Sequence, residues 1–113
     1  MKKNKYLLII CFLFFLNNAA SQCNGRYINE IFSNVDVSTT NYSDIFFDSE
    51  HEMDVYTPVG DSLQNRPLIL YFHGGSFTGD KSTIDCVDFC EYFSKRGYVT
   101  ASVNYRPVSY THL

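Results

Sequence analysis

A glycine-rich segment directly follows a run of apolar residues, and its composition suits one kind of chemistry. The run is Leu68–Leu70, and the segment is His73-Gly74-Gly75-Ser76-Phe77. Glycine lets the backbone turn sharply and lets its N–H groups approach another molecule with no Cβ in the way. Such N–H groups can stabilise the negative charge that forms on a carbonyl oxygen during acyl transfer, by roughly 2.7–4 kcal/mol for one donor. The segment is therefore a candidate oxyanion-binding loop.

The residues that would complete acyl-transfer chemistry are harder to find. A serine nucleophile often lies in a Gly-x-Ser-x-Gly turn that leads straight into a helix. Gly74 and Ser76 match the first glycine and the serine of this turn, but Thr78 replaces the second glycine. Several polar and glycine residues also precede the next predicted helix. His112 lies one residue from the end of the sequence, and His51 is more simply interpreted as a packed or surface histidine. We therefore expect no catalytic nucleophile, acid or base among these residues.

Three cysteines outside the N-terminal segment allow several roles. Cys86 and Cys90 are four residues apart on one face of a predicted helix, and Cys23 precedes them by more than sixty residues. A zinc site would need two more ligands at suitable spacing, and none is evident, so we predict no metal site. If one disulfide forms, we expect it to join Cys23 to a helix cysteine, because a bridge within one helical turn would be strained. Packing is the alternative role for the two helix cysteines.

The first 21 residues have the pattern of a secretory signal peptide. The pattern consists of a basic start, an apolar stretch and two small residues before the cleavage point: Met1–Lys5, Tyr6–Leu16, Ala19 and Ser21. The apolar stretch is too short to span a bilayer. The alternatives are an uncleaved anchor and a lipid anchor on Cys23, although Gln22 is not the small residue that lipidation favours. We predict cleavage before Gln22, and a chain of residues 22–113 that is secreted, periplasmic or at the cell surface without stable membrane insertion.

Charge and length limit the partners and the number of domains. Without the three lysines of the leader, six basic residues face twelve acidic ones, which gives a net charge of −6. This surplus argues against nucleic acid or an anionic membrane as a partner, because both favour Lys/Arg patches. Residues 22–113 can bury only a modest core. They contain no repeat or low-complexity linker, so we expect one domain or part of one.

Periodicity predicts four strands. Residues 35–42 and 50–56 alternate with a period of two, and the second segment is typical of an antiparallel strand near a sheet edge. Residues 67–72 are apolar on both faces, which predicts a central strand covered by helices on both sides. Residues 98–105 form a second buried strand of this kind.

A helix is predicted between the last two strands. It should begin near Ser82–Asp85, a sequence typical of a capping box, and end near Arg96 before Gly97. Its buried stripe is expected to contain Cys86, Val87, Cys90 and Phe93. A β–loop–α–β unit of this kind implies parallel pairing, hence an α/β fold. Ligands of open α/β sheets bind at the carboxyl ends of the strands, where the glycine-rich segment lies.

Three segments together resemble the N-terminal part of the carboxylesterase/lipase branch of the α/β-hydrolase superfamily. They carry the patterns D-V-Y-x-P, H-G-G-x-F and V-N-Y-R within residues 50–106. The resemblance implies an α/β-hydrolase sheet with three strands before the loop, and a helix and a fourth strand after it. It also implies that the N–H groups of Gly75 and Ser76 bind the oxyanion, that Gly74 permits the turn, and that His73 is a structural part of the loop.

The resemblance further implies a serine hydrolase that cleaves carboxylic esters through an acyl-enzyme and needs no cofactor. The substrate would be a small-molecule or polysaccharide-linked ester. Two alternatives stay open: a non-catalytic binding or adhesion protein of the same fold, and a secreted module in which His-Gly-Gly is merely a turn. A Gly-x-Ser-x-Gly sequence downstream would favour the hydrolase.

The end of the sequence leads to two further expectations. Residues 108–113 do not continue the family pattern, and we interpret them as a candidate non-native tail. We also expect residues 22–113 to be inactive alone. The fourth strand of this segment would be an exposed apolar edge where later strands should pair, and such an edge favours aggregation.

Overall fold

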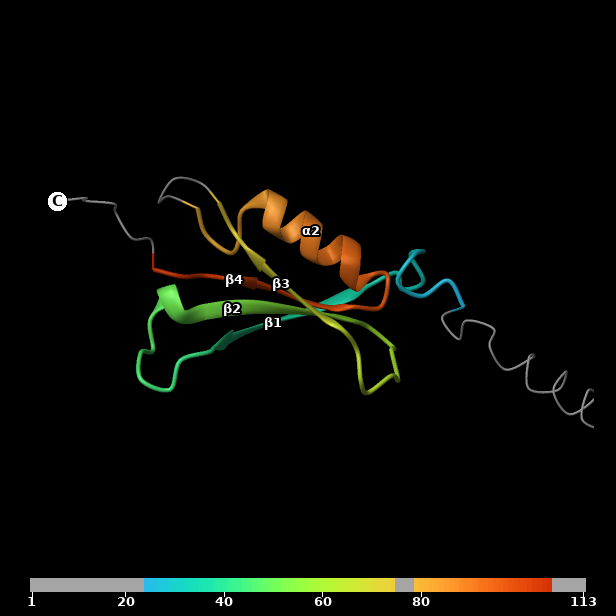
Figure 1. The fold of residues 1–113 in the computed structure, drawn as a ribbon, viewed down its shortest axis with the longest axis horizontal. Helices are drawn as coiled ribbons and strands as arrows, with labels where there is room; N and C mark the ends of the chain where they lie inside the picture. Colours follow the sequence, from blue (N-terminus) through green and yellow to red (C-terminus); the bar gives the residue numbers. More distant parts are fainter. Residues whose placement is uncertain (1–23, 75–78, 107–113) are drawn as a thin grey trace, which may run out of the picture.

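The computed structural model describes residues 24–74 and 79–106. Within these ranges, four strands form one mixed sheet and a single α-helix covers one of its faces (Figure 1). The elements, in chain order, are β1 (Val35–Asn41), the 3-10 turn η2 (Ser49–His51), β2 (Glu52–Pro58), β3 (Leu68–Phe72), α2 (Ile84–Ser94) and β4 (Val99–Val103). No helix in the described part of the chain is long and apolar enough to cross a membrane. The predicted leader lies outside the described residues.

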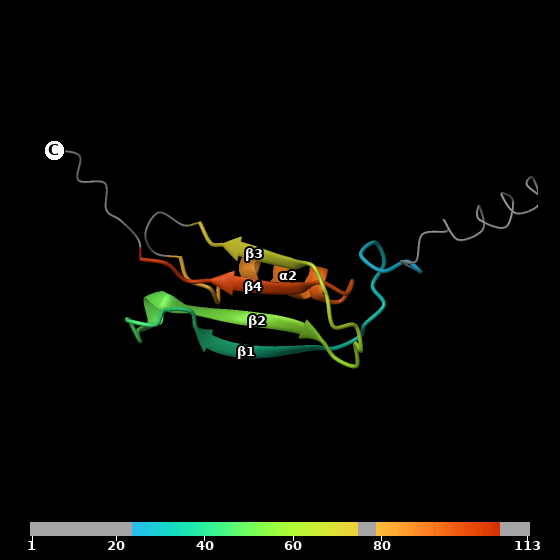
Figure 2. The same ribbon diagram turned by 60° about the horizontal axis from the view of Figure 1, so that its bottom comes forward.

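The strand order is β1-β2-β4-β3, and Figure 2 shows the four strands side by side. β2 pairs antiparallel with both β1 and β4, whereas β3 and β4 are parallel. This arrangement confirms the predicted α/β class, the antiparallel N-terminal strands and the parallel β–loop–α–β unit. β2 also lies next to the edge strand, as its alternating pattern predicted.

The prediction for β3 was wrong. β3 is an edge strand of the described sheet, and β4, which was expected to be the exposed edge, lies between β2 and β3. The apolar side chains of β3 that point away from α2 are about half exposed: Leu68 (57%), Leu70 (49%) and Phe72 (58%). They therefore form an open apolar face rather than one covered by a second helix.

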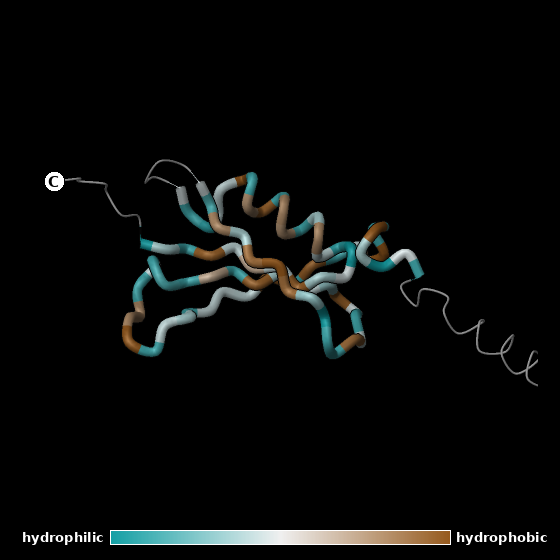
Figure 3. Tube along the Cα trace, viewed as in Figure 1, coloured by the Kyte–Doolittle hydropathy of each residue, from teal (hydrophilic) through white to brown (hydrophobic). Residues whose placement is uncertain are grey.

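This open face is hollowed beside β3. The hollow has a volume of about 370 Å³ and is lined by Tyr42, Met53, Leu70, Phe72 and Val103. Figure 3 shows apolar colour along much of β3. Since α2 packs on the other face of the sheet, the two faces differ: one is covered and the other is apolar and open.

The covered face is unusually polar for a core. Thr100 and Ser94 are fully buried, and their hydroxyl oxygens lie 3.0 Å apart. The Thr100 hydroxyl donates to the carbonyl oxygen of Cys90 at 2.9 Å, and that of Ser94 donates to the carbonyl oxygen of Tyr56 at 3.0 Å. These bonds satisfy the buried hydroxyls and join α2 to β2 and β4.

The helix differs slightly from its prediction. Its N-cap is Thr83 rather than Ser82, and the Thr83 hydroxyl donates to the Asp80 carbonyl oxygen at 3.0 Å instead of capping the helix. Of the predicted stripe, both cysteines are fully buried, whereas Val87 and Phe93 are half-buried. The sequence pattern missed Ser94, because periodicity in apolar residues cannot identify a buried hydroxyl.

Candidate active site

The candidate loop begins where parallel strands end together. His73 and Gly74 follow β3, and Asn104 and Tyr105 follow β4, so all four lie at the carboxyl edge of the sheet (Figure 1). This is the position that the sequence predicted for the loop. The two proposed donors, Gly75 and Ser76, lie outside the described residues.

His73 is held as a packed part of this edge. Its side chain is buried, and its ring stacks on Tyr105 with centroids 4.5 Å apart and an interplanar angle of 18°. Its Nδ1 lies 2.9 Å from the Gly74 carbonyl oxygen, and only a protonated Nδ1 can donate to that acceptor. The Tyr105 hydroxyl donates to the His73 carbonyl oxygen at 2.5 Å. These contacts support the structural role implied for His73.

A glycine that the sequence analysis missed closes the base of the loop. A Cβ on Gly79 would lie 2.0 Å from the Gly74 carbonyl oxygen and 2.7 Å from Nδ1 of His73. No side chain fits in that space, so this approach of the two ends of the loop requires glycine. The only signal in the sequence is a glycine shortly after the His-Gly-Gly motif.

The chain then returns to the sheet through Lys81. Its backbone N–H donates to Oδ1 of Asn104 at 2.6 Å, and its carbonyl oxygen accepts from the Ser102 hydroxyl at 2.8 Å. Its Nζ lies 2.7 Å from Oδ1 of Asp54 and 3.9 Å from Oε2 of Glu52. We call Asp54, Lys81, Ser102 and Asn104 the carboxyl-edge cluster.

Asp54 and Asn104 are themselves held in place. Oδ1 of Asp54 also accepts from the Thr39 hydroxyl at 2.6 Å. The side-chain amide of Asn104 donates to the Ser49 carbonyl oxygen at 2.8 Å, and the backbone carbonyl oxygen of Asn104 accepts from the Tyr42 hydroxyl at 2.8 Å. The carboxyl-edge cluster therefore connects three strands and the connection between β1 and β2.

A hollow of about 200 Å³ lies beside the loop. It is lined by Ser49, Glu50, His73, Gly79, Asp80, Asn104 and Tyr105. Asp80 accepts from the hydroxyl and backbone N–H of Ser82, and these bonds hold the pKa of the Asp80 carboxyl below its usual value. Glu50 is paired with Arg106 at 2.9 Å. Both carboxylates of the hollow thus already have protein partners.

The sequence matches the model of the BD-FAE family over residues 53–113, which is more than half of the chain. The chain belongs to the BD-FAE family. Crystal structures of esterase B from Lactobacillus Rhamnosis (HN001) are similar to this BD-FAE chain, with a TM-score of 0.57 and 23% identity. The alignment with one covers 96% of this chain and 34% of esterase B, and that with an inhibited form covers 91% and 33%. No curated protein matches the chain.

These comparisons confirm the predicted α/β-hydrolase fold and its esterase-related branch. The BD-FAE chain spans about a third of the length of the esterase B structures. Its three strands before the loop, and the helix and strand after it, occur in the predicted order. This order places His73 and Gly74 directly after the third strand.

Neither helix cysteine of the BD-FAE chain is placed for chemistry. Cys86 and Cys90 are fully buried, and they are not bonded to each other. Burial raises the pKa of the Cys90 thiol to about 11, and Sγ of Cys86 lies 2.9 Å from the Thr83 hydroxyl. Packing thus accounts for both thiols. Cys23 lies outside the described residues, so the predicted bridge stays a prediction.

The two other histidines considered as candidates are His51 and His112. His51 stacks on Phe46 with ring centroids 5.1 Å apart, and its Nδ1 lies 2.6 Å from Oδ1 of Asp48. It is therefore a packed surface histidine, as the sequence indicated. His112 and the segment 108–113 lie outside the described residues. Within the described ranges, no group of three His, Cys, Asp or Glu side chains could hold a metal ion.

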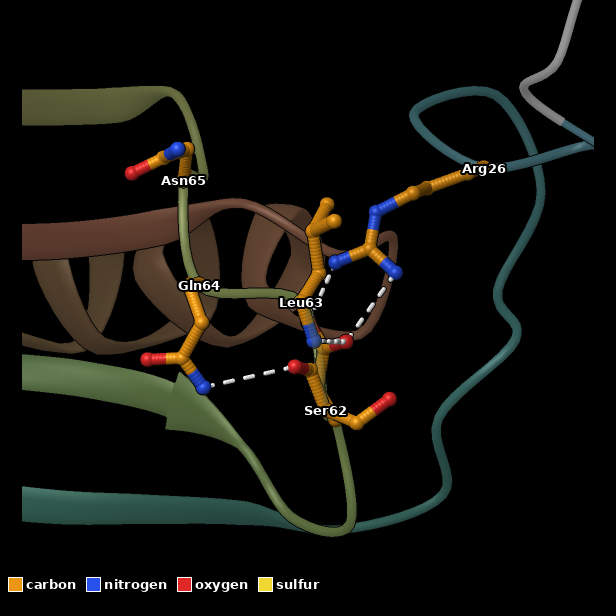
Figure 4. Close-up of a pocket in the computed structure, with 6 residues that line it drawn as sticks. Arg26, Ser62, Leu63, Gln64 and Asn65 are labelled. Atoms are coloured by element: carbon orange, nitrogen blue, oxygen red, sulfur yellow. Dashed lines mark hydrogen bonds and ion pairs between the residues drawn. The ribbon is translucent and has the colours of Figure 1, made fainter.

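A second ionic group lies at the opposite, amino-terminal edge of β3 and β4 (Figure 4). Arg26 donates to both carboxylate oxygens of Asp61 and, at 3.1 Å, to the Gly97 carbonyl oxygen. Arg66 lies 3.5 Å from the same carboxylate. We call Arg26, Asp61, Arg66 and Gly97 the amino-edge cluster. It joins the segment before β1 to the sheet, far from the candidate loop.

Proposed function

We propose that residues 24–106 belong to the N-terminal part of a secreted serine hydrolase that cleaves carboxylic esters. The observation that carries this proposal is the placement of His73-Gly74 at the carboxyl edge, with the loop closed by Gly79, in a member of an esterase-related family. The substrate would be a small-molecule ester, free or linked to a polysaccharide. The similarity to crystal structures of an esterase also favours an ester.

The proposed chemistry assigns one task to this part of the protein. A serine oxygen attacks the ester carbonyl carbon, and the electrons of the C=O bond move to the oxygen. The backbone N–H groups of Gly75 and Ser76 would stabilise that oxyanion. The general base takes the proton of the attacking serine hydroxyl and gives it to the departing alcohol. An acyl-enzyme remains, which water hydrolyses. No step needs a cofactor.

The serine nucleophile and its acid and base would be supplied by the remainder of the full-length protein. Within the described part of the chain, no Ser, His and carboxylate converge at the carboxyl edge in a triad. His73 uses Nδ1 on a backbone carbonyl oxygen, and Ser102 donates to Lys81. The chain alone, without such groups, is expected to be inactive.

The test is the variant Gly75→Val in the full-length protein. A β-branched side chain should distort the loop backbone and lower kcat for p-nitrophenyl acetate by about 100-fold or more. Gly60→Val is the matched control, because Gly60 lies in an exposed turn at the opposite, amino-terminal edge and a Cβ there would have no atom within 4 Å. Its φ of +82° means that the variant loses stability through backbone strain, so kcat is measured on the folded protein. The control should retain kcat. The proposal is refuted if the wild-type protein shows no saturable esterase activity, or if Gly75→Val retains full activity.

A further inference from the structure

The loop has two ends, and they are held by different means. The outgoing end follows β3, so the ladder of the sheet holds it, and the Tyr105 hydroxyl adds a bond to the His73 carbonyl oxygen. The returning end, residues 79–82, belongs to no strand. Backbone donors stabilise a developing charge effectively only when they are fixed in advance. The returning end therefore needs an anchor of its own.

Lys81 supplies that anchor. Among the described residues, the hydrogen bonds that join segment 79–82 to the sheet all involve Lys81. Its N–H binds Asn104, its carbonyl oxygen binds Ser102, and its ammonium binds Asp54. The other bonds of the segment run within it or to the start of α2, and do not reach a strand.

The ion pair is well protected for an interaction at the edge of a sheet. The Lys81 and Asp54 side chains are 14% and 12% exposed, and the nitrogen–oxygen distance is 2.7 Å. The Thr39 hydroxyl binds the same carboxylate oxygen of Asp54. Loss of the ammonium would leave a largely buried carboxylate without its charge partner, which is strongly unfavourable. The pair therefore fixes the residue whose backbone attaches the loop to β4.

We propose that Lys81, held by Asp54, is a positioning residue for the oxyanion loop. The inference rests on the proposed function, because it assigns the anchored loop a role in ester hydrolysis. Lys81 acts through the backbone and does not touch the reacting atoms. Loosening it should disturb donors that matter most in the transition state, so kcat should fall while KM changes little.

The experiment uses the full-length protein and two readouts. Lys81→Met removes the ammonium and keeps both backbone bonds, Asp54→Asn removes the charge of its partner, and Lys81→Arg restores a cation. Glu30→Gln is the matched control, because it removes an ion pair, 3.1 Å from Arg96 to Glu30, whose carboxylate is about half exposed (53%). Hydrogen–deuterium exchange of residues 79–83 reports the anchor, and p-nitrophenyl acetate hydrolysis reports kcat and KM.

We expect Lys81→Met and Asp54→Asn to speed exchange of residues 79–83 and to lower kcat by about 10-fold, with KM within about threefold. Lys81→Arg should recover most of both, and Glu30→Gln should match the wild type. If Lys81→Met does not fold, Thr39→Val removes only the hydroxyl on Asp54 and should give the same changes at smaller size.

Two outcomes overturn the inference: unchanged exchange in both Lys81→Met and Asp54→Asn, or a loss of kcat/KM that comes from KM alone. A wild-type protein without esterase activity refutes the proposed function instead. The exchange measurement then still decides whether the pair anchors the loop, because it does not depend on turnover.

Discussion

Both edges of the sheet use an ion pair to hold an irregular segment, but the two pairs are balanced differently. In the carboxyl-edge cluster, one ammonium meets the carboxylate of Asp54, with the more exposed Glu52 further away. In the amino-edge cluster, Asp61 meets two guanidinium groups, those of Arg26 and Arg66. The first cluster is close to electrically neutral, whereas the second carries an excess of positive charge around one carboxylate.

Hydrogen bonding differs in the same way. The backbone N–H, the carbonyl oxygen and the ammonium of Lys81 each have a protein partner. At the amino edge, Nε of Arg26 and Nε of Arg66 are buried without a hydrogen-bond partner among the described residues. Arg26 also lies against the rings of Tyr27 and Phe32, so its position depends on packing as well as on charge.

The two ion pairs should therefore control different properties of the protein. Removing Asp61 would leave the guanidinium groups of Arg26 and Arg66 without the carboxylate that they share, so the amino edge should contribute mainly to stability. Loss of the ion pair in the carboxyl-edge cluster should also cost stability, but the further hydrogen bonds around it remain, so the position of the loop should change as well. Changes at the amino edge should therefore affect stability without esterase activity, whereas changes at the carboxyl edge should affect both.

The largest expected effect follows the change Asp61→Asn. It removes the one carboxylate shared by Arg26 and Arg66, and breaking a largely buried pair from one side costs about 3 kcal/mol of unfolding free energy. Urea denaturation of the full-length protein measures this loss, while kcat of the folded variant should stay close to wild type. A loss below about 1 kcal/mol, typical of a surface pair, would remove the distinction between the two edges.

A smaller effect is expected from Gly97→Ala. Gly97 has φ of +97°, and its Cβ would lie 2.8 Å from Nε and 2.9 Å from Cζ of Arg26, which Asp61 holds in place. Backbone strain together with displacement of Arg26 should cost about 2–3 kcal/mol.

Gly60→Ala is the control for this prediction. Gly60 has φ of +82° with no atom within 4 Å of the Cβ position, so it should cost only the strain, about 1 kcal/mol. Thermal unfolding of both variants gives the comparison. Equal losses would mean that Gly97 is needed for its backbone conformation alone, and not for the approach of Arg26.

The sequence predicted where the strands begin and end better than it predicted which strands pair with each other. Alternation predicted β1 and β2 to within two residues. In β2 the period of two matches one buried face, formed by Asp54, Tyr56 and Pro58, whereas β1 is exposed along most of its length and its alternation reports strand geometry alone. The place of β3 could not be found in this way. Apolar residues on both faces of residues 68–72 indicate hydrophobicity, whereas sheet order depends on which strands pair across long connections.

The candidate site shows the same limit. The His-Gly-Gly motif located the loop, since the motif is local and follows a strand. It did not reveal Lys81 as an anchor. The partners of Lys81 lie 21, 23 and 27 residues away, at Ser102, Asn104 and Asp54, and no periodic pattern connects them. Polar contacts between distant segments become visible only when the strand register is known.

The smallest expected effect is the response of the amino edge to acid. Burial raises the pKa of Asp61, but hydrogen bonds from Arg26 and from the Leu63 N–H, with the nearby positive charges, outweigh burial and lower its pKa below 3.8. A carboxyl group with a lowered folded-state pKa contributes stability above its unfolded-state pKa, and that contribution is lost as the pH falls through the folded-state value. The wild type should lose this contribution to its unfolding free energy below about pH 4, whereas Asp61→Asn lacks the carboxylate and does not have the contribution at any pH.

The difference in unfolding free energy between the wild type and Asp61→Asn should therefore be largest near neutral pH and shrink steadily as the solution is acidified. Other carboxyl groups with lowered pKa, such as Asp80 and Asp85, are present in both proteins and cancel in this difference. Phe93→Leu is the control, because it weakens packing against Tyr98 without touching a carboxylate, and its difference from wild type should stay constant with pH. A constant difference for Asp61→Asn as well would mean that Arg26 and Arg66 do not stabilise the charged form of Asp61, and the proposed imbalance between the two edges would fail.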